Sequence, residues 1–239
     1  MDLRTAKELN ELTTNFYARV GESFSATRQN PWKGWERVRE LAHPYGPNLS
    51  VLDLACGNLR FEHFLALDHP NLRAWAIDHD EALAQAGGVE TLPWISFVPL
   101  DVIGTLLDGE DLETALSAPP CDLSVCFGFM HHIAFPPHRA AVLRALVKHT
   151  KPGGLAIASF WQFVRSPRIL AKAQPLHDNG DYLLGWQNRT DVQRYCHSYA
   201  DEEINELVAS LGSEAREVER FQADGKAGNL NCYVVLRRA

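Results

Sequence analysis

Short apolar segments alternate with amphipathic segments along most of the chain, and this alternation predicts the fold. Runs rich in β-branched and aromatic residues predict strands at 50–55, 72–77, 95–98, 122–127 and 155–160. Helical spacing in the intervening segments predicts helices at 59–67, 81–86 and 137–149. Asp80 is placed to cap the second of these helices. Strands separated by helices form right-handed βαβ units, so we expect a parallel sheet.

The two ends of the chain depart from this alternation. A helix at 201–211 is followed by two strands, 215–221 and 231–237, around a glycine-containing loop. Such a hairpin predicts an antiparallel C-terminal edge strand. The chain before the first strand has the pattern of two amphipathic helices, and the segment after the fifth strand is rich in aromatic and basic residues. We therefore expect one α/β domain over 1–239, a seven-stranded sheet with helices on both faces, a helical cap (1–45) and a substrate-side insertion (161–200).

The composition excludes fibrous, disordered and membrane-spanning proteins. The chain has 239 residues, of which 46% are hydrophobic and 22% charged, as in ordinary globular domains. No segment approaches the roughly 20 apolar residues of a membrane span, and the first residues lack the pattern of a signal peptide. The 5 cysteines are scattered without a C-x-x-C pair, which favours reduced thiols in the cytoplasm over disulfides or structural zinc.

The charge is unevenly distributed along the chain. The formal net charge is −7, but residues 51–120 hold 12 acidic and 2 basic side chains, whereas 121–200 hold 4 acidic and 9 basic ones. An acidic total argues against general affinity for phosphate backbones. The local basic excess is compatible either with an anion-binding surface or with a solvated face.

A loop of small residues follows the first strand, at Asp53-Leu-Ala-Cys-Gly-Asn-Leu-Arg60. Open parallel sheets bind ligands at the carboxyl ends of such strands, and the helix that follows offers free N–H groups. The loop lacks the G-x-G-x-x-G pattern of pyrophosphate binding, so a compact zwitterion fits it better. Asp78 and Asp101 follow the second and third strands in the same position, where they could accept ribose hydroxyls and an adenine amino group.

These motifs resemble those of the class I S-adenosylmethionine-dependent methyltransferases, over roughly residues 45–239. The matching segments are D-L-A-C-G from Asp53, A-I-D-H-D around Asp78, P-L-D-V around Asp101 and K-P-G-G from Lys151. The resemblance implies a Rossmann-like fold and S-adenosyl-L-methionine as the cofactor. The residues that it assigns to cofactor binding are Asp53, Ala55, Cys56, Gly57, Asn58, Asp78, His79, Asp101, Val102 and Phe127.

Two positions in the loop depart from the glycines of that family. Ala55 and Leu59 stand where the family has glycine. Leucine rarely adopts a positive φ. We therefore expect that position 59 does not require one.

Three further segments resemble the tRNA wobble-uridine methyltransferases that esterify a 5-carboxymethyl group, including the methyltransferase domain fused to an AlkB-type oxygenase in animals. They are Tyr17-x6-Phe24-Ser-x-Thr27-Arg28-x-x-Pro31-Trp32, Met130-His131-His132 and Arg194-Tyr195-Cys196-His197-Ser198-Tyr199. The resemblance implies methylation of a carboxylate in the tRNA anticodon loop. Some members of this group need a small zinc-containing activator protein.

The chemistry of methyl transfer suggests catalytic residues. A carboxylate nucleophile is ionised at pH 7 and needs a cation to hold it rather than a general base. Arg28 is the candidate for this role or for holding the cofactor's own carboxylate. His131 and His132 could donate a hydrogen bond to the substrate, or act as a base if the nucleophile is a hydroxyl or an amine. We expect no metal site, because the histidines lack ligand spacing at positions 131, 132, 177 and 197.

The substrate side rests on aromatic and basic residues. The candidates for substrate contact are Trp32, Arg194, Tyr195 and His197. Aromatic side chains that either stack on a flipped base or belong to the core are Trp32, Trp161, Trp186 and Tyr195. Basic residues that could contact phosphates are Lys33, Arg37, Arg165, Arg168, Lys172, Arg189 and Arg194.

Three functions remain open from the sequence. The tRNA carboxylate methyltransferase is favoured by the segments around Arg28 and Arg194. A small-molecule carboxyl, hydroxyl or amine methyltransferase is favoured by the acidic pI of about 5.8. A catalytically idle binding protein is the third possibility, and the presence of all three strand-end aspartates argues against it.

Overall fold

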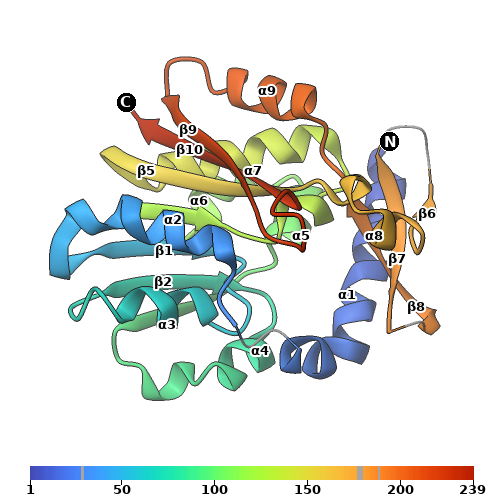
Figure 1. Ribbon diagram of the computed structural model, residues 1–239, viewed down its shortest axis with the longest axis horizontal. Coiled ribbons are helices and arrows are strands. Elements are labelled where there is room, and N and C mark those ends of the chain that lie inside the picture. Colours follow the sequence, from blue (N-terminus) through green and yellow to red (C-terminus); the bar gives the residue numbers. More distant parts are fainter. Residues whose placement is uncertain (28–29, 177–179, 188) are drawn as a thin grey trace.

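A seven-stranded sheet forms the centre of the computed structural model, which describes residues 1–27, 30–176, 180–187 and 189–239. The strand order is β3-β2-β1-β4-β5-β10-β9, with helices on both faces (Figure 1). The strands are β1 (Ser50–Leu54), β2 (Arg73–Asp78), β3 (Ile95–Pro99), β4 (Cys121–Cys126), β5 (Thr150–Trp161), β9 (Ala215–Ala223) and β10 (Asn231–Arg238). Strands β1 to β5 pair in parallel, which confirms the predicted α/β sheet.

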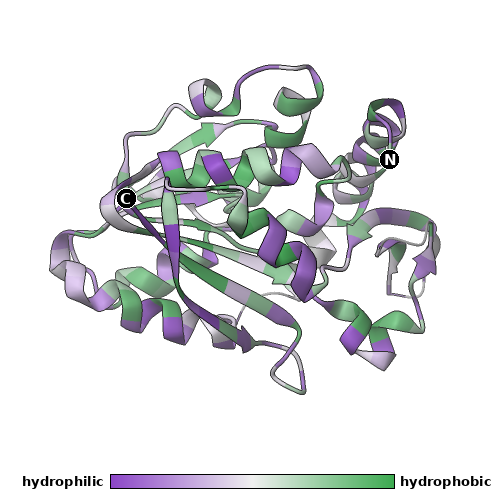
Figure 2. Cartoon of the chain, turned by 90° about the horizontal axis from the view of Figure 1, so that it is seen from above, coloured by the Kyte–Doolittle hydropathy of each residue, from purple (hydrophilic) through white to green (hydrophobic). Residues whose placement is uncertain are grey.

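Both faces of the sheet are buried, because alternate residues of a strand pack into different clusters. In β1, Val51 packs with Trp35 and Phe64, whereas its neighbour Leu52 packs with Leu143. In Figure 2 the central strands are mostly green and the surrounding helices are banded green and purple. This two-sided burial explains why the strands are almost continuously apolar in sequence.

The C-terminal strand β10 is antiparallel to both of its neighbours, β5 and β9. The predicted antiparallel C-terminal strand is therefore present, and it lies one position inside the edge. The residue pattern explains the order, since β10 is buried over most of its length whereas β9 is exposed or only partly buried at nearly every residue. The more polar strand occupies the solvated edge.

Helices predicted at 59–67, 81–86, 137–149 and 201–211 are confirmed as α3, α4, α7 and α9, with ends shifted by at most two residues. Asp80 caps α4 as predicted, accepting a hydrogen bond from the backbone N–H of Leu83 at 3.2 Å. No helix in the described ranges is both long enough and apolar enough to cross a bilayer. The helices are α1 (Leu3–Ala26), α2 (Lys33–Ala42), α3 (Arg60–Ala66), α4 (Glu81–Ala86), α5 (Val102–Leu107), α6 (Leu112–Ala115), α7 (Pro136–Lys148), α8 (Pro167–Leu170) and α9 (Asp201–Ala209).

The segment after β5 forms a small second sheet beside α1 (Figure 1). Its antiparallel strands are β6 (Gln174–Pro175), β7 (Asp181–Trp186) and β8 (Arg189–His197). Phe16 and Val20 of α1 pack against Val192 of β8, and Arg19 forms an ion pair with Asp191 at 2.7 Å. The first helix and this segment, far apart in sequence, thus pack on one another beside the carboxyl ends of the main strands.

Candidate functional site

A cavity of about 460 Å³, here called the main cavity, lies at the carboxyl ends of β1 and β4. Its wall combines parts of α1 and α2, the β1–α3 loop, the residues after β4, the end of β5, one residue of β8 and the β9–β10 loop. The polar side chains in the wall include Tyr17, Lys33, Asp53, Asn58, Arg60, His131, Arg194 and Asp224, and the aromatic ones are Trp32, Trp35, Phe61, Phe127 and Trp161.

The β1–α3 loop reaches this wall through an unusual backbone. Ala55, Gly57 and Leu59 have φ angles of 69°, 55° and 59°, all in the left-handed region. The expectation that position 59 does not need a positive φ is therefore wrong. The Leu59 side chain is fully buried against Cys56, Ala74 and other apolar residues, and this packing holds the strained residue at the start of α3. A left-handed non-glycine residue costs about 1–2 kcal/mol.

The aspartates at the carboxyl ends of β1 and β2, Asp53 and Asp78, lie together at this loop. Asp53 is 2% exposed and lines the main cavity. Asp78 accepts hydrogen bonds from the N–H groups of Gly57 and Asp80, each at 2.9 Å, while the half-exposed His79 ring lies 3.5 Å from its carboxylate. Burial raises the pKa of Asp78, because the cost of desolvation exceeds the effect of these two hydrogen bonds.

Asp101 occupies the corresponding end of β3 but has a different role in this structure. Its carboxylate caps α5 by accepting a hydrogen bond from the N–H of Gly104 at 2.9 Å. The side chain is exposed and does not line the main cavity, and Val102 beside it is buried in the core. The structure thus brings Asp53 and Asp78 together and leaves Asp101 on the neighbouring strand end.

Sequence reasoning missed a third carboxyl group at this end of the sheet, that of Glu62. It is fully buried in α3 and interacts with Asp53. Burial, with the neighbouring carboxyl, raises the pKa of Asp53 well above its ordinary value, and burial also raises that of Glu62. In the described ranges, no lysine or arginine nitrogen forms an ion pair with Asp53, Glu62 or Asp78. The available signal was the position of Glu62 between the apolar residues Phe61 and Leu65 of an inward-facing helix.

Tyr17, which lines the cavity, forms a hydrogen-bonded pair with His132. The hydroxyl oxygen of Tyr17 lies 3.0 Å from Nε2 of His132, and Nδ1 of the same ring lies 3.1 Å from the carbonyl oxygen of Tyr195. A carbonyl only accepts, so Nδ1 carries a hydrogen, and in the neutral ring Nε2 accepts from the Tyr17 hydroxyl. The sequence motif contained Tyr17, but its pairing with His132 depends on the fold.

His131 lines the main cavity beside this pair. Its ring centroid lies 4.0 Å from that of His132 and 4.8 Å from that of Trp161. Arg194 also lines the cavity and is 5% exposed, with its guanidinium 4.6 Å above the ring of Phe16. A buried guanidinium in a cavity wall is a site for a carboxylate or a phosphate group.

Trp32 lines the cavity through close packing on the loop that follows β4. Its ring stacks on Trp35 with centroids 5.4 Å apart, and a Cβ atom on Gly128 would lie 2.9 Å from the Trp32 ring. Gly128 also has a φ of 68°, so glycine is required there for two reasons. Trp186 lies elsewhere and donates a hydrogen bond from its indole N–H to the Ser23 hydroxyl at 3.1 Å.

Tyr195 and His197 do not line the main cavity. Both are buried in a network beneath it that also contains Arg139, Asp181 and Glu203. The ring nitrogens of His197 lie 2.7 Å from a carboxylate oxygen of Asp181 and of Glu203, and the Tyr195 hydroxyl donates to Asp181. Arg28 and His177, which the sequence also singled out, lie outside the described residues.

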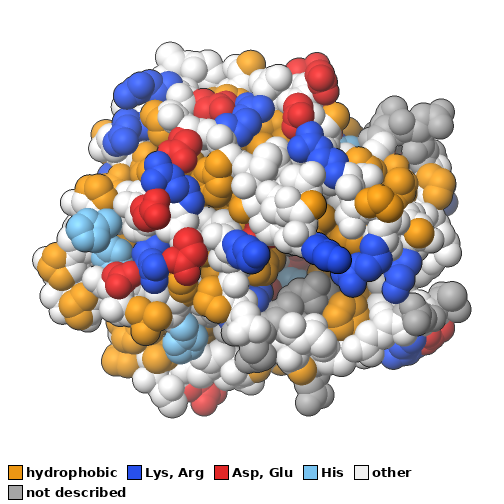
Figure 3. All heavy atoms as spheres, viewed as in Figure 1, with side chains coloured by type: hydrophobic (Ala, Val, Ile, Leu, Met, Phe, Trp, Pro, Cys, Tyr) orange, Lys and Arg blue, Asp and Glu red, His pale blue; other side chains and the backbone are white. Residues whose placement is uncertain are grey.

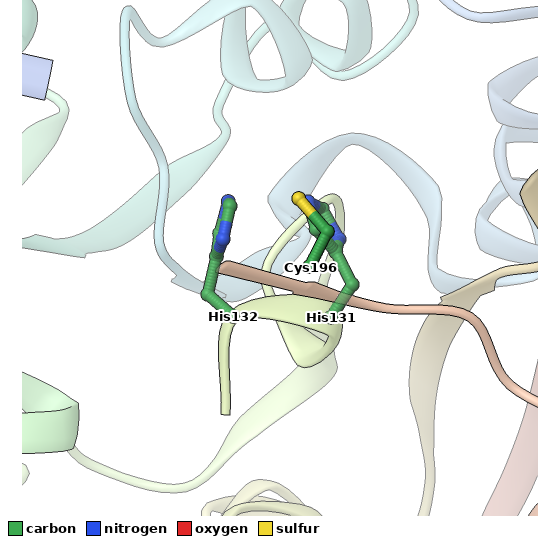
Figure 4. A group of neighbouring side chains, drawn as sticks. All are labelled: His131, His132 and Cys196. Carbon is green, nitrogen blue, oxygen red and sulfur yellow. The ribbon is translucent and has the colours of Figure 1, made fainter. Parts of the chain in front are cut away.

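One group of potential metal ligands occurs near the cavity: His131, His132 and Cys196, whose ligand atoms lie within 4.8 Å of one another (Figure 4). The sequence pattern did not point to this set. Both ring nitrogens of His132 already have hydrogen-bond partners. Burial raises the pKa of the Cys196 thiol to about 11, which disfavours the thiolate that a metal requires. The group is therefore better suited to packing than to metal binding.

Comparisons with known proteins agree with this architecture. Residues 52–156 match the family model described as a methyltransferase domain. A provisionally named methyltransferase of Encephalitozoon cuniculi is 27% identical over 201 residues, 82% of this chain and 84% of that protein. Among solved structures, an S-adenosylmethionine-dependent methyltransferase from Clostridium acetobutylicum superposes with a TM-score of 0.63 at 12% identity, covering 93% of this chain and 99% of that one.

Residues 52–156 form a methyltransferase domain. The chain is an S-adenosylmethionine-dependent methyltransferase with a Rossmann-like sheet. The N-methyltransferase NodS of Bradyrhizobium japonicum, solved with S-adenosyl-L-homocysteine, has the same fold, with a TM-score of 0.57 at 18% identity, covering 87% of this chain and 88% of NodS. The methyltransferase domain begins in β1 and ends in β5, so it contains the loop from Asp53 and the ends of β2 and β3. It excludes Tyr17 and Arg194, which α1 and β8 contribute to the wall of the cavity.

Proposed function

We propose that this methyltransferase transfers a methyl group to a carboxylate on a modified wobble uridine of tRNA, forming the methyl ester of a carboxymethyl group. The observation that carries the proposal is the charge arrangement in the main cavity. Its wall holds the buried carboxyl of Asp53 at one end and the buried guanidinium of Arg194 contributed by β8. A cavity with both groups suits a cationic methyl donor together with an anionic acceptor.

The cofactor would lie against the β1–α3 loop. S-adenosyl-L-methionine supplies a sulfonium-bound methyl group and also carries an ammonium group. Asp53 would attract this cationic end, the backbone of Ala55 to Asn58 would line its path, and Asp78 would accept ribose hydroxyls. Phe127 lines the cavity and would pack against the cofactor. Roles for His79, Asp101 and Val102 belong to the same proposal, at the ends of β2 and β3.

The acceptor carboxylate would lie against Arg194. A guanidinium binds a carboxylate through two parallel hydrogen bonds, which positions the nucleophilic oxygen for an in-line displacement. Trp32 and Trp161 also line the cavity, where a uracil ring could stack between or against them. Arg28 remains a second candidate for the same carboxylate.

The surface around the cavity provides a path for a phosphate backbone. Figure 3 shows lysine and arginine side chains gathered across the middle of one face beside a hollow, where Figure 1 places α8 and the β9–β10 loop. Arg168 belongs to α8, Lys226 to the β9–β10 loop, and Lys33 lines the cavity itself. This local basic surface supports tRNA as the substrate despite the net charge of −7.

Radiolabelled methyl transfer tests the proposal. The purified protein is given labelled cofactor with bulk tRNA that carries carboxymethyluridine, or with a metabolite extract. We expect label in tRNA that mild alkali releases as methanol, because esters hydrolyse under those conditions. Replacing Arg194 by alanine should lower kcat/KM about 10- to 100-fold, as expected from loss of a charge-assisted hydrogen bond of about 1.5–3 kcal/mol. Arg216→Ala is the control, because Arg216 is exposed on β9 and does not line the cavity.

Label found only in metabolites, with none in tRNA, would contradict the tRNA proposal. The assay is repeated with a small zinc-containing activator protein, since some of the tRNA wobble-uridine methyltransferases that this chain resembles need one. Cytoplasmic residence is part of the same proposal, and the 5 cysteines, all unpaired and buried, suit a reducing compartment.

A second candidate is a methyltransferase for a hydroxyl or amine acceptor, and one observation favours it. The tautomer of His132 makes Nε2 a base, with the Tyr17 hydroxyl between it and the cavity. An acceptor proton could pass to Tyr17 oxygen as the Tyr17 proton passes to His132. With cofactor and acceptor both saturating, carboxylate methylation should be independent of pH between about 6 and 9, whereas this relay predicts a rate that rises with pH.

A further inference from the structure

Glu62 is a buried acid whose polar atoms are unsatisfied. The residue is 0% exposed, and apart from the neighbouring Asp53 carboxyl neither of its carboxyl oxygens has a hydrogen-bond partner on another described side chain. Leaving a buried polar group without a partner costs about 1–3 kcal/mol, and more when it is charged. The arrangement therefore calls for a proton or a ligand that the chain itself does not supply.

The group next to Glu62 is the carboxyl of Asp53, which is 2% exposed and lines the main cavity. Two carboxylates cannot hydrogen-bond to each other unless one carries a proton, since an ionised carboxylate only accepts. One shared proton makes either group a donor to the other and removes one negative charge from a buried position. The nearest comparable arrangement in chemistry is a carboxylic acid dimer that has lost one proton.

The surroundings of the pair contain acids and thiols. From the β2 end, Asp78 adds a further negative charge, and the thiols of Cys56 and Cys126 face the pair from the loop and from β4. Burial holds the pKa of both thiols above their ordinary value, so both stay neutral at physiological pH. The half-exposed ring of His79 lies beside Asp78 rather than beside the pair.

We propose that Asp53 and Glu62 share one proton in the cofactor-free protein and release it to solvent when the cationic end of S-adenosyl-L-methionine binds. This inference rests on the proposed position of the cofactor against Asp53. The positive cofactor takes over the charge compensation that the proton provides, so the doubly ionised pair becomes the favoured state. Glu62 is then a positioning residue, which acts on the cofactor through Asp53.

Proton release makes cofactor affinity depend on pH. If binding releases one proton, the association constant rises up to about tenfold per pH unit in the range where the free pair holds that proton. Glu62→Gln removes the effect, because its amide donates to Asp53 as the protonated acid does but has no proton to lose. The variant should bind the cofactor with an affinity that is nearly independent of pH.

Isothermal titration calorimetry with S-adenosyl-L-methionine tests this directly. Titrations at pH 7 in phosphate and in Tris, whose ionisation enthalpies differ, give the number of protons released per bound cofactor. We expect a value approaching about one for the wild type and near zero for Glu62→Gln. Glu90→Gln is the matched control, since Glu90 is exposed and does not line the main cavity, and it should behave as the wild type does.

The outcomes separate this inference from the function it rests on. Cofactor binding without proton release in the wild type, or equal release in the wild type and Glu62→Gln, overturns the shared proton and leaves the methyltransferase proposal intact. The wild-type measurement needs no substitution, so a variant that fails to fold does not remove the test. Absence of any cofactor binding would instead contradict the proposed site.

Discussion

Two buried clusters of acidic side chains lie close to the main cavity, and they are built in opposite ways. Beneath the cavity, Asp181 and Glu203 are compensated by Arg139 and by His197, whose two ring nitrogens both face carboxylates. At the carboxyl end of β1, Asp53 and Glu62 have no such cation among the described residues. A buried charge that the chain itself compensates holds elements together, whereas one left uncompensated is a site for a cation from outside.

The pKa shifts follow this difference. Burial alone would raise the pKa of Asp181 and Glu203, but hydrogen bonds from His197, together with its charge and that of Arg139, outweigh burial and hold both pKa values below their ordinary range. At the other cluster, burial and like charge act in the same direction and raise the pKa of Asp53. The two clusters should therefore respond to pH with opposite signs.

The largest effect is expected from breaking the compensated cluster. Arg139 is 3% exposed and donates to Glu203 at 2.5 Å and to the Tyr195 hydroxyl at 3.0 Å. Arg139→Met leaves two buried carboxylates with the His197 ring alone, and it should lower the unfolding free energy by about 3–5 kcal/mol. Urea denaturation measures this. Arg144→Met, on the same helix with a partly exposed ion pair to Glu214, should cost less than about 1 kcal/mol, and equal losses would contradict the comparison.

The second largest effect is expected in the pH dependence of stability, which should differ between the Asp181–Glu203 cluster and the Asp53–Glu62 cluster. Acids with lowered pKa values stabilise the fold above their unfolded pKa, so the contribution of Asp181 and Glu203 is lost as the pH falls below about 4. The raised pKa values of Asp53 and Glu62 have the opposite consequence, because the folded protein holds a proton that the unfolded chain releases. Stability should fall by up to about 1.4 kcal/mol per pH unit from about pH 4, where the unfolded carboxyls ionise, up to the raised pKa in the folded protein, which is about 7 for Glu62.

Glu62→Gln provides the control for the loss of stability with rising pH. It should flatten this loss and leave the loss of stability in acid unchanged, because Asp181 and Glu203 are untouched. Chemical denaturation of both proteins at several pH values between about 3 and 8 checks both losses. A wild-type protein whose stability does not change between about pH 5 and 7 would speak against a proton shared in the folded state.

The smallest effect is expected from the strained β1–α3 loop. Ala55 has a φ of 69°, which glycine adopts without strain. Ala55→Gly should raise the unfolding free energy by about 1 kcal/mol, since relief of left-handed strain exceeds the added entropy of the unfolded chain. Ala82→Gly in helix α4 should instead cost about 0.5–1 kcal/mol, because alanine is favoured there. Thermal unfolding compares the two, and destabilisation by both would show that Ala55 is not strained.

Much of the fold was predictable from the sequence because it rests on local pattern. Alternation of apolar strands with amphipathic helices located β1 to β5, and Asp80 marked the start of α4. The loop backbone was not predictable in the same way. Leucine at 59 argues locally against a positive φ, yet tertiary packing of its side chain outweighs that preference.

The site was predictable only where a general rule of the fold places its residues. The positions of Asp53 and Asp78 follow from the rule that parallel strands end at one edge of a sheet. The pairing of Tyr17 with His132 joins residues 115 positions apart, and the burial of Glu62 depends on which helix face meets the sheet. The motif containing Tyr195 and His197 looked like substrate contact, but the fold uses it for the compensated cluster beneath the cavity.

Tyr195 links this cluster to the cavity through two different parts of one residue. Its hydroxyl contacts Arg139 and Asp181, while its backbone carbonyl sets the tautomer of His132. Along a β-strand, successive residues reverse the direction of both side chain and carbonyl. A single-residue insertion or deletion in β8 upstream of Tyr195 would turn its ring and its carbonyl away together. The β7–β8 hairpin can therefore vary in length at its tip. Between the tip and Tyr195, only insertions or deletions of two residues keep the Tyr195 carbonyl on Nδ1 of His132, and with it the present tautomer of that ring.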